Sequence, residues 1–286
     1  SNKSKYQLEK IVRMTKLTML VLSKQLAAGN FEPKYFEKSF GESDNLEALN
    51  IELKNNAKMY LRGKIDRVDI YVDEDATLVK IIDYKTGNMK WELDMPFYGR
   101  ALQLVIYLDA VMEQLTKEGK EVLPAAFFYY HIDEPFLTRD EAKKENAFLS
   151  KLKPMGIVNT DLNIIKHLDK SIETGSDVIP VLLKKDGSIS KTSSVASTDR
   201  INLLRKYVRQ KAKNTAENIL SGEISITPSL RGGRSSCEYC PYSAICGFDE
   251  GIEGFVYNNL VKIKDDDIWE MMEKNKHVDK GTTGGN

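Results

Sequence analysis

The chain has 286 residues, which is enough for one large domain or a domain with an appendage, and either can bury a sizeable core. Its 42 Lys and Arg residues balance 42 Asp and Glu residues, so the overall charge points to no particular partner. No apolar run is long enough to span a membrane and no signal-peptide pattern opens the chain, so we expect a cytoplasmic protein without a membrane partner.

The first 132 residues predict a helix, three strands, a second helix and a further strand. Apolar residues recur at helical spacing over residues 6–28, and FEPKYFEKSF predicts a strand starting after Pro33. Two more strands are predicted over residues 59–72 and 77–87, joined by an acidic turn, followed by a helix from Phe97 to about Leu115 and the strand PAAFFYYHI. A strand after a long helix can pair parallel with an earlier strand, so we expect an α/β fold with a mixed sheet flanked by helices.

The remaining segments predict additions to this core. We expect residues 1–135 to form the core, 136–197 to be an insertion with small helices and a hairpin turning at residues 185–188, and 198–275 to hold a long helix and a cysteine segment that packs on the core. Residues 276–286 are expected to be disordered. The long helix carries a run of cations that fits either a nucleic-acid patch or a solvated helix face: Arg200, Arg205, Lys206, Arg209, Lys211 and Lys213.

Charged residues interrupt the apolar strands at three points, and burying such charges is costly unless they are paired or bind a metal. Asp83 and Lys85 are two residues apart, so on a strand they share one face, and Asp66 on the preceding strand can approach them. Two carboxylates and the main-chain carbonyl of Tyr84 are oxygen ligands suited to Mg²⁺. A nearby ammonium can orient an attacking water or neutralise a phosphate, so the pattern predicts metal-assisted phosphodiester hydrolysis, with a surface ion pair as the alternative.

The helix that follows carries Gln103 and Tyr107 one turn apart on one face, where they can hold the lysine or a nucleic-acid backbone. The motifs Gly63-x-Ile65-Asp66, Asp83-Tyr84-Lys85-Thr86-Gly87 and Gln103-x-x-x-Tyr107 together resemble the RecB-type branch of the PD-(D/E)XK nucleases. The resemblance implies a restriction-endonuclease-like core with metal ligands at Asp66 and Asp83 and a catalytic lysine at Lys85. It also implies that Gln103 and Tyr107 support the active site or the DNA.

Two further positions bear on this resemblance. Glu37 falls where many members of the branch carry an acidic residue, although an exposed strand charge is an equal alternative. The branch also places a histidine on the helix before the first strand, and this chain has none there. His131, His167 and His277 all lie downstream, and we expect solvent or core roles for them. The histidine motif is therefore either absent or upstream of a chain that begins inside its first helix, as a piece of a longer protein would.

The three cysteines form the pattern Cys237-x-x-Cys240-x5-Cys246, which is too few for a disulfide framework and fits a reducing compartment. The pattern predicts a metal or cluster site, although three thiolates leave a tetrahedral zinc or a [4Fe–4S] cluster one ligand short. A zinc knuckle completed by a histidine and a loop with buried free cysteines are the alternatives.

The stretches CEYCPYSAICGF and GEISITP resemble AddB-type nuclease-helicase subunits over about residues 17–270. In that family three such cysteines join a fourth, which is absent from this chain, to bind a [4Fe–4S] cluster. The resemblance implies the C-terminal domain of a bacterial Mg²⁺-dependent DNA exonuclease, with Mn²⁺ as a substitute, that acts with an AddA-like helicase-nuclease subunit in double-strand-break repair and recombination. The rival hypotheses are an inactive nuclease-fold module for DNA binding or assembly and a zinc-stabilised interaction domain.

Overall fold

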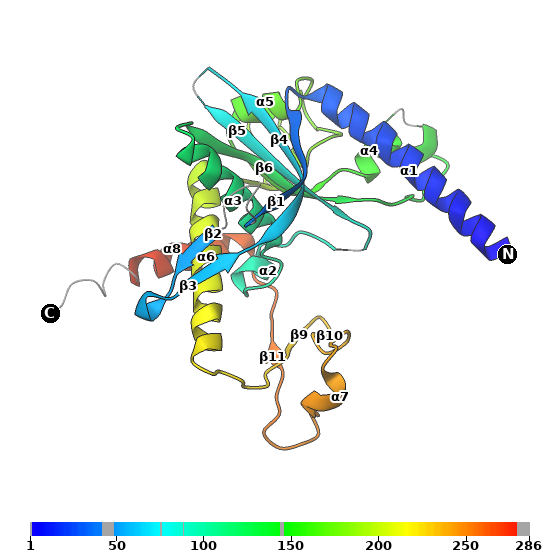
Figure 1. Ribbon diagram of the computed structural model, residues 1–286. Helices are drawn as coiled ribbons and strands as arrows, with labels where there is room; N and C mark the ends of the chain where they lie inside the picture. Colours follow the sequence, from blue (N-terminus) through cyan, green and yellow to red (C-terminus); the bar gives the residue numbers. More distant parts are fainter. Residues whose placement is uncertain (1, 42–48, 75, 88, 144–145, 279–286) are drawn as a thin grey trace.

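The computed structural model describes residues 2–41, 49–74, 76–87, 89–143 and 146–278 (Figure 1). Within these residues a six-stranded sheet forms the centre of the fold, in the order β1-β4-β5-β6-β7-β8. Its strands are β1 (Glu32–Phe40), β4 (Gly63–Val72), β5 (Thr77–Lys85), β6 (Val122–His131), β7 (Met155–Asn159) and β8 (Val195–Ala196). The β1–β4, β4–β5 and β6–β7 pairs are antiparallel, and β5–β6 and β7–β8 are parallel, so the predicted mixed sheet is confirmed.

Helices cover both faces of this sheet, which explains why the central strands are apolar throughout. On β5, Val79 and Ile81 pack against α3 (Gln103–Lys117) and α6 (Thr198–Leu220). Leu78 and Ile82 pack on the other face, against α1 (Asn2–Ala28), α4 (Ala147–Lys151) and α5 (Leu162–Leu168). The sheet is therefore the middle of three layers, and its charged residues need specific partners.

Two predicted elements are broken in the structure. The strand predicted over residues 59–72 is interrupted at Arg62, because β3 (Lys58–Leu61) pairs with β2 (Leu49–Glu52) in a separate hairpin and only β4 joins the main sheet. The helix predicted from Phe97 begins at Gln103 instead. The short α2 (Asp94–Phe97) precedes it, and the chain between them turns through positive φ angles at Gly99 and Ala101.

Residues 136–197, expected to form an insertion, contribute to the main sheet as well as to its surroundings. They contain α4, α5 and the 3₁₀ turn η2 (Glu141–Lys143), and their strands β7 and β8 extend the sheet beyond β6. The predicted turn is present, because Lys184 N donates to Ser188 O at 2.8 Å. Another 3₁₀ turn, η1 (Lys54–Asn56), joins β2 and β3.

After α6 the chain leaves the core and forms a small sheet that projects from it (Figure 1, orange). This part contains β9 (Ser229–Arg231), β10 (Arg234–Ser235), α7 (Ser243–Cys246) and β11 (Asn258–Asn259). The chain then returns as α8 (Asp265–Val278), which buries Ile268, Trp269 and Met272 beside α3 and α6 and was not predicted from the sequence. The start of the expected disordered tail, residues 276–278, belongs to α8, and residues 279–286 lie outside the described residues.

The cations on α6 do not form one free patch. Arg205 and Arg209 both bind Asp109 of α3, and Arg209 also binds Glu113. These two arginines therefore hold α6 against α3, which favours a structural role for this part of the helix. No helix in the described part of the chain is long and apolar enough to cross a membrane.

Candidate active site

Asp66 and Asp83 lie next to each other where β4 and β5 pair. The register joins Arg67 to Ile82, and one step further along the two strands the aspartates stand opposite each other. Asp66 Oδ2 accepts a hydrogen bond from Tyr84 N at 2.8 Å, which fixes its carboxylate across the strand pair. The spacing that the sequence predicted therefore does bring the two carboxylates to one place.

Lys85 extends this pair into a chain of contacts that reaches α3. Its Nζ lies 2.5 Å from Asp83 Oδ2 and donates to Gln103 Oε1 at 3.0 Å. Gln103 Nε2 in turn donates to the hydroxyl of Tyr107 at 2.7 Å. Lys85 Nζ also lies 5.3 Å from the ring centre of Tyr129, within range of a cation–π contact. The glutamine of the third motif thus contacts the lysine of the second motif directly, and the tyrosine holds the glutamine.

Burial dominates the electrostatics of Asp83, whose side chain is 1% exposed. It raises the pKa of Asp83, the Lys85 ammonium opposes that rise, and the neighbouring Asp66 carboxylate adds to it. Burial likewise raises the pKa of Tyr129 to about 12, with Asp83 adding to the rise. A second cation beside Asp66 and Asp83 would therefore stabilise the two carboxylates together.

The donor atoms fit a hard divalent cation. Asp83 Oδ2 is buried and receives no well-angled hydrogen bond from the described residues, although Lys85 lies beside it as an ion-pair partner. No three His, Cys, Asp or Glu side chains in the described part of the chain are gathered to hold a metal ion. A pair of carboxylates nevertheless suits Mg²⁺, which commonly keeps several waters and takes one or two carboxylates together with phosphate oxygens.

A second charged cluster, which sequence analysis missed, lies on the opposite face of the same strands. Arg67 Nε and Lys80 Nζ bind the fully buried Asp69 at 2.6 and 2.9 Å. Arg67 also donates to the hydroxyl of Tyr84 at 3.3 Å, so the Tyr84 side chain points away from Asp83. The sequence signal was the presence of these charges in two strands that are otherwise apolar.

Glu37 and the histidines occupy different surroundings. Glu37 lies in β1 at the level of Asp66, with a positive φ angle, and its exposed side chain pairs with Lys64 at 2.5 Å. His167 packs on the ring of Tyr71 at 4.2 Å, away from the site, and the side chain of His277 is outside the described residues. His131, in contrast, is the register partner of Lys85, and its buried Nε2 has no hydrogen-bond partner in the described part of the chain.

The three cysteines follow one another in the projecting part of the chain. All are half-buried free thiols, and backbone bonds from Cys240 N to Cys237 O and from Cys246 N to Tyr242 O shape the segment. Gly247 ends α7 in a left-handed conformation, which glycine adopts without strain. Among the residues that the structure describes, the three thiols are not gathered around one metal position.

A mixed sheet that brings two aspartates and a lysine together at a strand pair, with a glutamine and a tyrosine on the next helix, defines a nuclease of the metal-dependent type. Residues 1–247 match the family model described as the PD-(D/E)XK nuclease superfamily, and the chain belongs to this superfamily. Nucleases of the superfamily generally depend on divalent metal ions.

Curated relatives share most of this chain. It is 38% identical over 288 aligned residues to the B subunit of the ATP-dependent helicase/deoxyribonuclease of a Thermoanaerobacter species, covering 98% of this chain and 25% of that protein. Proteins of the same name from Clostridium tetani and Acetivibrio thermocellus are 39% and 36% identical, over 98% and 92% of this chain. The chain spans about a quarter of the length of the relatives it matches.

Proposed function

We propose that this chain is a Mg²⁺-dependent deoxyribonuclease domain that hydrolyses the phosphodiester bonds of a DNA strand as an exonuclease. The observation that carries the proposal is the connected set formed by Asp66, Asp83, Lys85, Gln103 and Tyr107. Membership of the nuclease superfamily and the name "helicase/deoxyribonuclease" of the relatives support it.

Each residue of the set has a role in this proposal. Asp66 and Asp83 hold the metal, and the main-chain carbonyl of Tyr84 is a further ligand. When bound, Mg²⁺ or Mn²⁺ supplies positive charge that stabilises the charge developing on the scissile phosphate. Lys85 orients the attacking water, and Gln103, itself held by Tyr107, fixes the position of the ammonium. The 3′-oxygen leaves as a hydroxyl and the other product retains a 5′-phosphate.

The proposal extends to the cysteine segment, the cellular compartment and the partner subunit. Cys237, Cys240 and Cys246 would bind a [4Fe–4S] cluster together with a fourth cysteine that this chain does not contain. The spacing of the three cysteines supports this assignment, whereas their positions among the described residues do not yet converge on one point. The domain works in the cytoplasm with an AddA-like helicase-nuclease subunit in double-strand-break repair and recombination. The relatives are named as one subunit of an enzyme, which supports a partner. Residues 1–135 carry the active site in this scheme, and residues 198–275 carry the cysteine segment.

The test is cleavage of single-stranded DNA in Mg²⁺ by the wild type and by the variants Asp83→Asn and Lys85→Ala. Removing one such electrostatic group costs about 10²–10³-fold in kcat or more, and we expect a loss of at least that size in both variants, with circular dichroism showing that each variant is still folded at the assay temperature. Lys184→Ala, in the exposed turn far along the chain, is the control. Retained cleavage in both variants would contradict the assignment of Asp83 and Lys85 to the active site. A wild type that binds DNA without cutting it would favour the alternative of an inactive nuclease-fold module.

A further inference from the structure

The two strands that carry the proposed metal ligands are paired along their backbones only up to the candidate site. The register of β4 with β5 ends at Arg67 and Ile82. The proposed ligands lie one or two residues beyond that pair: Asp66, Asp83 and Tyr84. On its other edge, β5 stays paired with β6 to its last residue. The position of β5 relative to β4 at the site therefore depends on contacts made by side chains.

Two hydrogen bonds tie Tyr84 to β4 beyond the last backbone pair. Tyr84 N donates to Asp66 Oδ2 at 2.8 Å, and Arg67 Nη1 donates to the hydroxyl of Tyr84 at 3.3 Å on the opposite face of the sheet. Because Asp66 and Arg67 are consecutive residues, the two bonds close a loop of contacts through the sheet. This loop fixes the main chain of Tyr84 relative to Asp66 from two sides.

Arg67 is itself held rigidly. Its Nε and Nη2 bind the two carboxylate oxygens of Asp69, each at 2.6 Å, and both residues are buried. Lys80 adds a second ion pair to Asp69 at 2.9 Å and lies 5.1 Å from the ring centre of Phe31. A guanidinium is planar, so binding at two of its nitrogens also fixes the direction of the third. Nη1 is therefore directed at Tyr84 by a group that cannot turn away without breaking a buried ion pair, which is costly.

A neighbouring tyrosine shows what the hydroxyl of Tyr84 adds. Tyr130 is the register partner of Tyr84 on β6, and the two rings meet edge to face with their centres 5.8 Å apart. The buried hydroxyl of Tyr130 has no hydrogen-bond partner in the described part of the chain. The two tyrosines thus share their ring contact but differ in their hydroxyl contacts, so the bond from Arg67 is a specific feature of Tyr84.

We propose that Arg67, held by Asp69, is a positioning residue that fixes the metal-binding end of β5 by anchoring the side chain of Tyr84. The inference rests on the proposed nuclease function and gives that function a buried support on the face of the sheet opposite the metal. Groups that orient metal ligands are typically worth about 10–100-fold in metal affinity or activity. Octahedral Mg²⁺ is sensitive to such orientation because it demands near-ideal geometry.

The first test measures the affinity of the 286-residue chain for Mn²⁺ alone, from the electron paramagnetic resonance signal of the free ion. Tyr84→Phe keeps the ring and removes only the hydroxyl, and we expect it to bind Mn²⁺ about tenfold more weakly, at the low end of the range for orienting groups. Tyr130→Phe removes a hydroxyl that binds nothing in the described chain and should keep the wild-type affinity. Unchanged affinity in Tyr84→Phe, or an equal loss in Tyr130→Phe, would overturn the proposal.

The second test asks whether Arg67 acts through Tyr84. Arg67→Lys keeps a cation beside Asp69 but removes the nitrogen that reaches Tyr84, and it should also weaken Mn²⁺ binding about tenfold. The double variant Arg67→Lys/Tyr84→Phe should bind Mn²⁺ about as weakly as the single variants, because both remove one shared contact. Losses that multiply to about 100-fold would overturn the proposed route. A lower free energy of unfolding with unchanged Mn²⁺ affinity of the folded variants would show a merely structural role and overturn it too.

Kinetics separate this proposal from the proposed function. In DNA cleavage, Tyr84→Phe should raise the Mn²⁺ concentration for half-maximal rate about tenfold and leave the KM for DNA unchanged, since the hydroxyl lies on the face away from the metal. If the wild type cleaves DNA, Asp83→Asn loses Mn²⁺ and Tyr84→Phe keeps the wild-type Mn²⁺ affinity, the positioning role fails and the nuclease function stands. If Tyr84→Phe weakens Mn²⁺ binding but the wild type cleaves no DNA, the nuclease function fails and the positioning role stands.

Discussion

At the scale of single residues, the buried carboxylate of Asp83 requires a neighbouring cation to compensate its charge. An unpaired buried charge costs several kcal/mol, and Lys85 at 2.5 Å offsets part of that cost. Lys85 is in turn held by Gln103, and Gln103 by Tyr107, so three side chains from two elements fix one ammonium. Such positioning matters because a reacting group displaced by about 1 Å can lose about 10²-fold in rate.

From these contacts we predict that Gln103 positions the Lys85 ammonium for catalysis. Gln103→Ala removes the acceptor of the Lys85 ammonium, and we expect kcat for DNA cleavage to fall about 10- to 100-fold with a smaller change in KM. Gln103→Glu, which retains an acceptor oxygen, should restore part of the loss. Gln210→Ala on α6 is the matched control, because Gln210 also donates to a side chain four residues later but lies on an exposed face. A kcat unaffected by Gln103→Ala would contradict this role.

At the scale of helices and strands, a buried ion cluster joins α3 to α6. Asp109 is almost fully buried, Arg205 Nε donates to it at 2.9 Å, and Arg209 binds both Asp109 and Glu113. The same helix α3 carries Gln103 and Tyr107 in its first two turns, so α6 supports the helix that contributes to the candidate active site. The sequence allowed the cations of α6 to form either a nucleic-acid patch or a solvated helix face. In the structure, Arg205 and Arg209 instead form ion pairs between α6 and α3.

Removing the shared anion should therefore destabilise the protein strongly. Asp109→Ala leaves Arg209 with Glu113 as its remaining carboxylate and Arg205 with only its hydrogen bond to Asn202, and we expect the free energy of unfolding to fall by about 3–5 kcal/mol. Urea denaturation measures this change. Glu270→Ala, which removes an exposed ion pair with Lys274, should cost about 0.5 kcal/mol or less. Equal losses in the free energy of unfolding of the two variants would show that burial of the ion cluster contributes nothing to its effect on stability.

Helices and strands could be predicted where the pattern of apolar residues within the segment itself determines the structure. The helical spacing of α1 and α6 and the apolar runs of β5 and β6 need no knowledge of the rest of the fold, and their predicted positions agree with the structure. The break at Arg62 depends on pairing with β2, and the late start of α3 depends on a positive φ angle at Ala101, a residue with no preference for it. Neither can be read from a periodic pattern.

The contacts of the candidate active site also fall into those that local sequence spacing predicts and those that depend on the three-dimensional fold. Asp83 with Lys85, and Gln103 with Tyr107, are set by spacing within one strand or one helix, so their proximity followed from the sequence. The buried cluster around Asp69 and the place of His131 beside Lys85 depend on which faces are covered and on the parallel β5–β6 register. These features became visible only with the three-dimensional arrangement.

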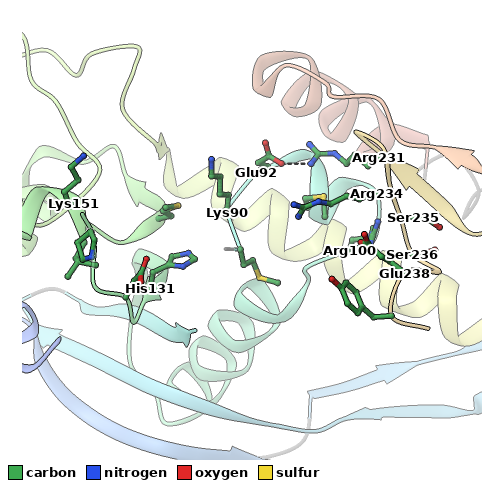
Figure 2. A pocket seen from close by; sticks show the side chains of 17 residues that line it. Lys90, Glu92, Arg100, His131, Lys151, Arg231, Arg234, Ser235, Ser236 and Glu238 are labelled. Carbon is green, nitrogen blue, oxygen red and sulfur yellow. Dashed lines mark hydrogen bonds and ion pairs between the residues drawn. The ribbon is translucent and has the colours of Figure 1, made fainter. Parts of the chain in front are cut away.

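At the scale of the whole molecule, a few ion pairs between side chains attach the projecting cysteine segment to the core. Arg231 binds Glu92 at 2.5 Å and the buried Asp94 at 2.6 Å, and Lys262 also binds Glu92 at 3.1 Å. The hydroxyl of Tyr98 adds a hydrogen bond to Val261 O at 2.7 Å. Since Glu92 also lines the cleft of about 960 Å³ that includes Lys90 and His131, this attachment forms part of the wall of that cleft (Figure 2).

Acid should loosen this attachment. The hydrogen bond from Arg231 holds the pKa of Glu92 below its ordinary value of 4.5 against the opposing effect of burial, and Lys262 adds to the lowering. Its stabilising contribution is therefore complete above pH 4.5 and is lost as the pH falls through the lower pKa of the folded state. Limited proteolysis between residues 232 and 257 over this range should show faster cleavage in acid for the wild type. Glu92→Gln should be cleaved faster already at neutral pH and respond less to acid, and identical profiles would contradict the role of Glu92.

The central claim is that Asp66 and Asp83 together hold the catalytic metal, and a crystal of the chain soaked in Mn²⁺ tests it most directly. Anomalous diffraction should place a manganese ion between the two carboxylates, within about 2.0–2.3 Å of an oxygen of each. The ion should be absent from crystals of Asp83→Asn soaked in the same way. A wild-type crystal at saturating Mn²⁺ with no ion between Asp66 and Asp83, or with the same ion in Asp83→Asn, would contradict the account.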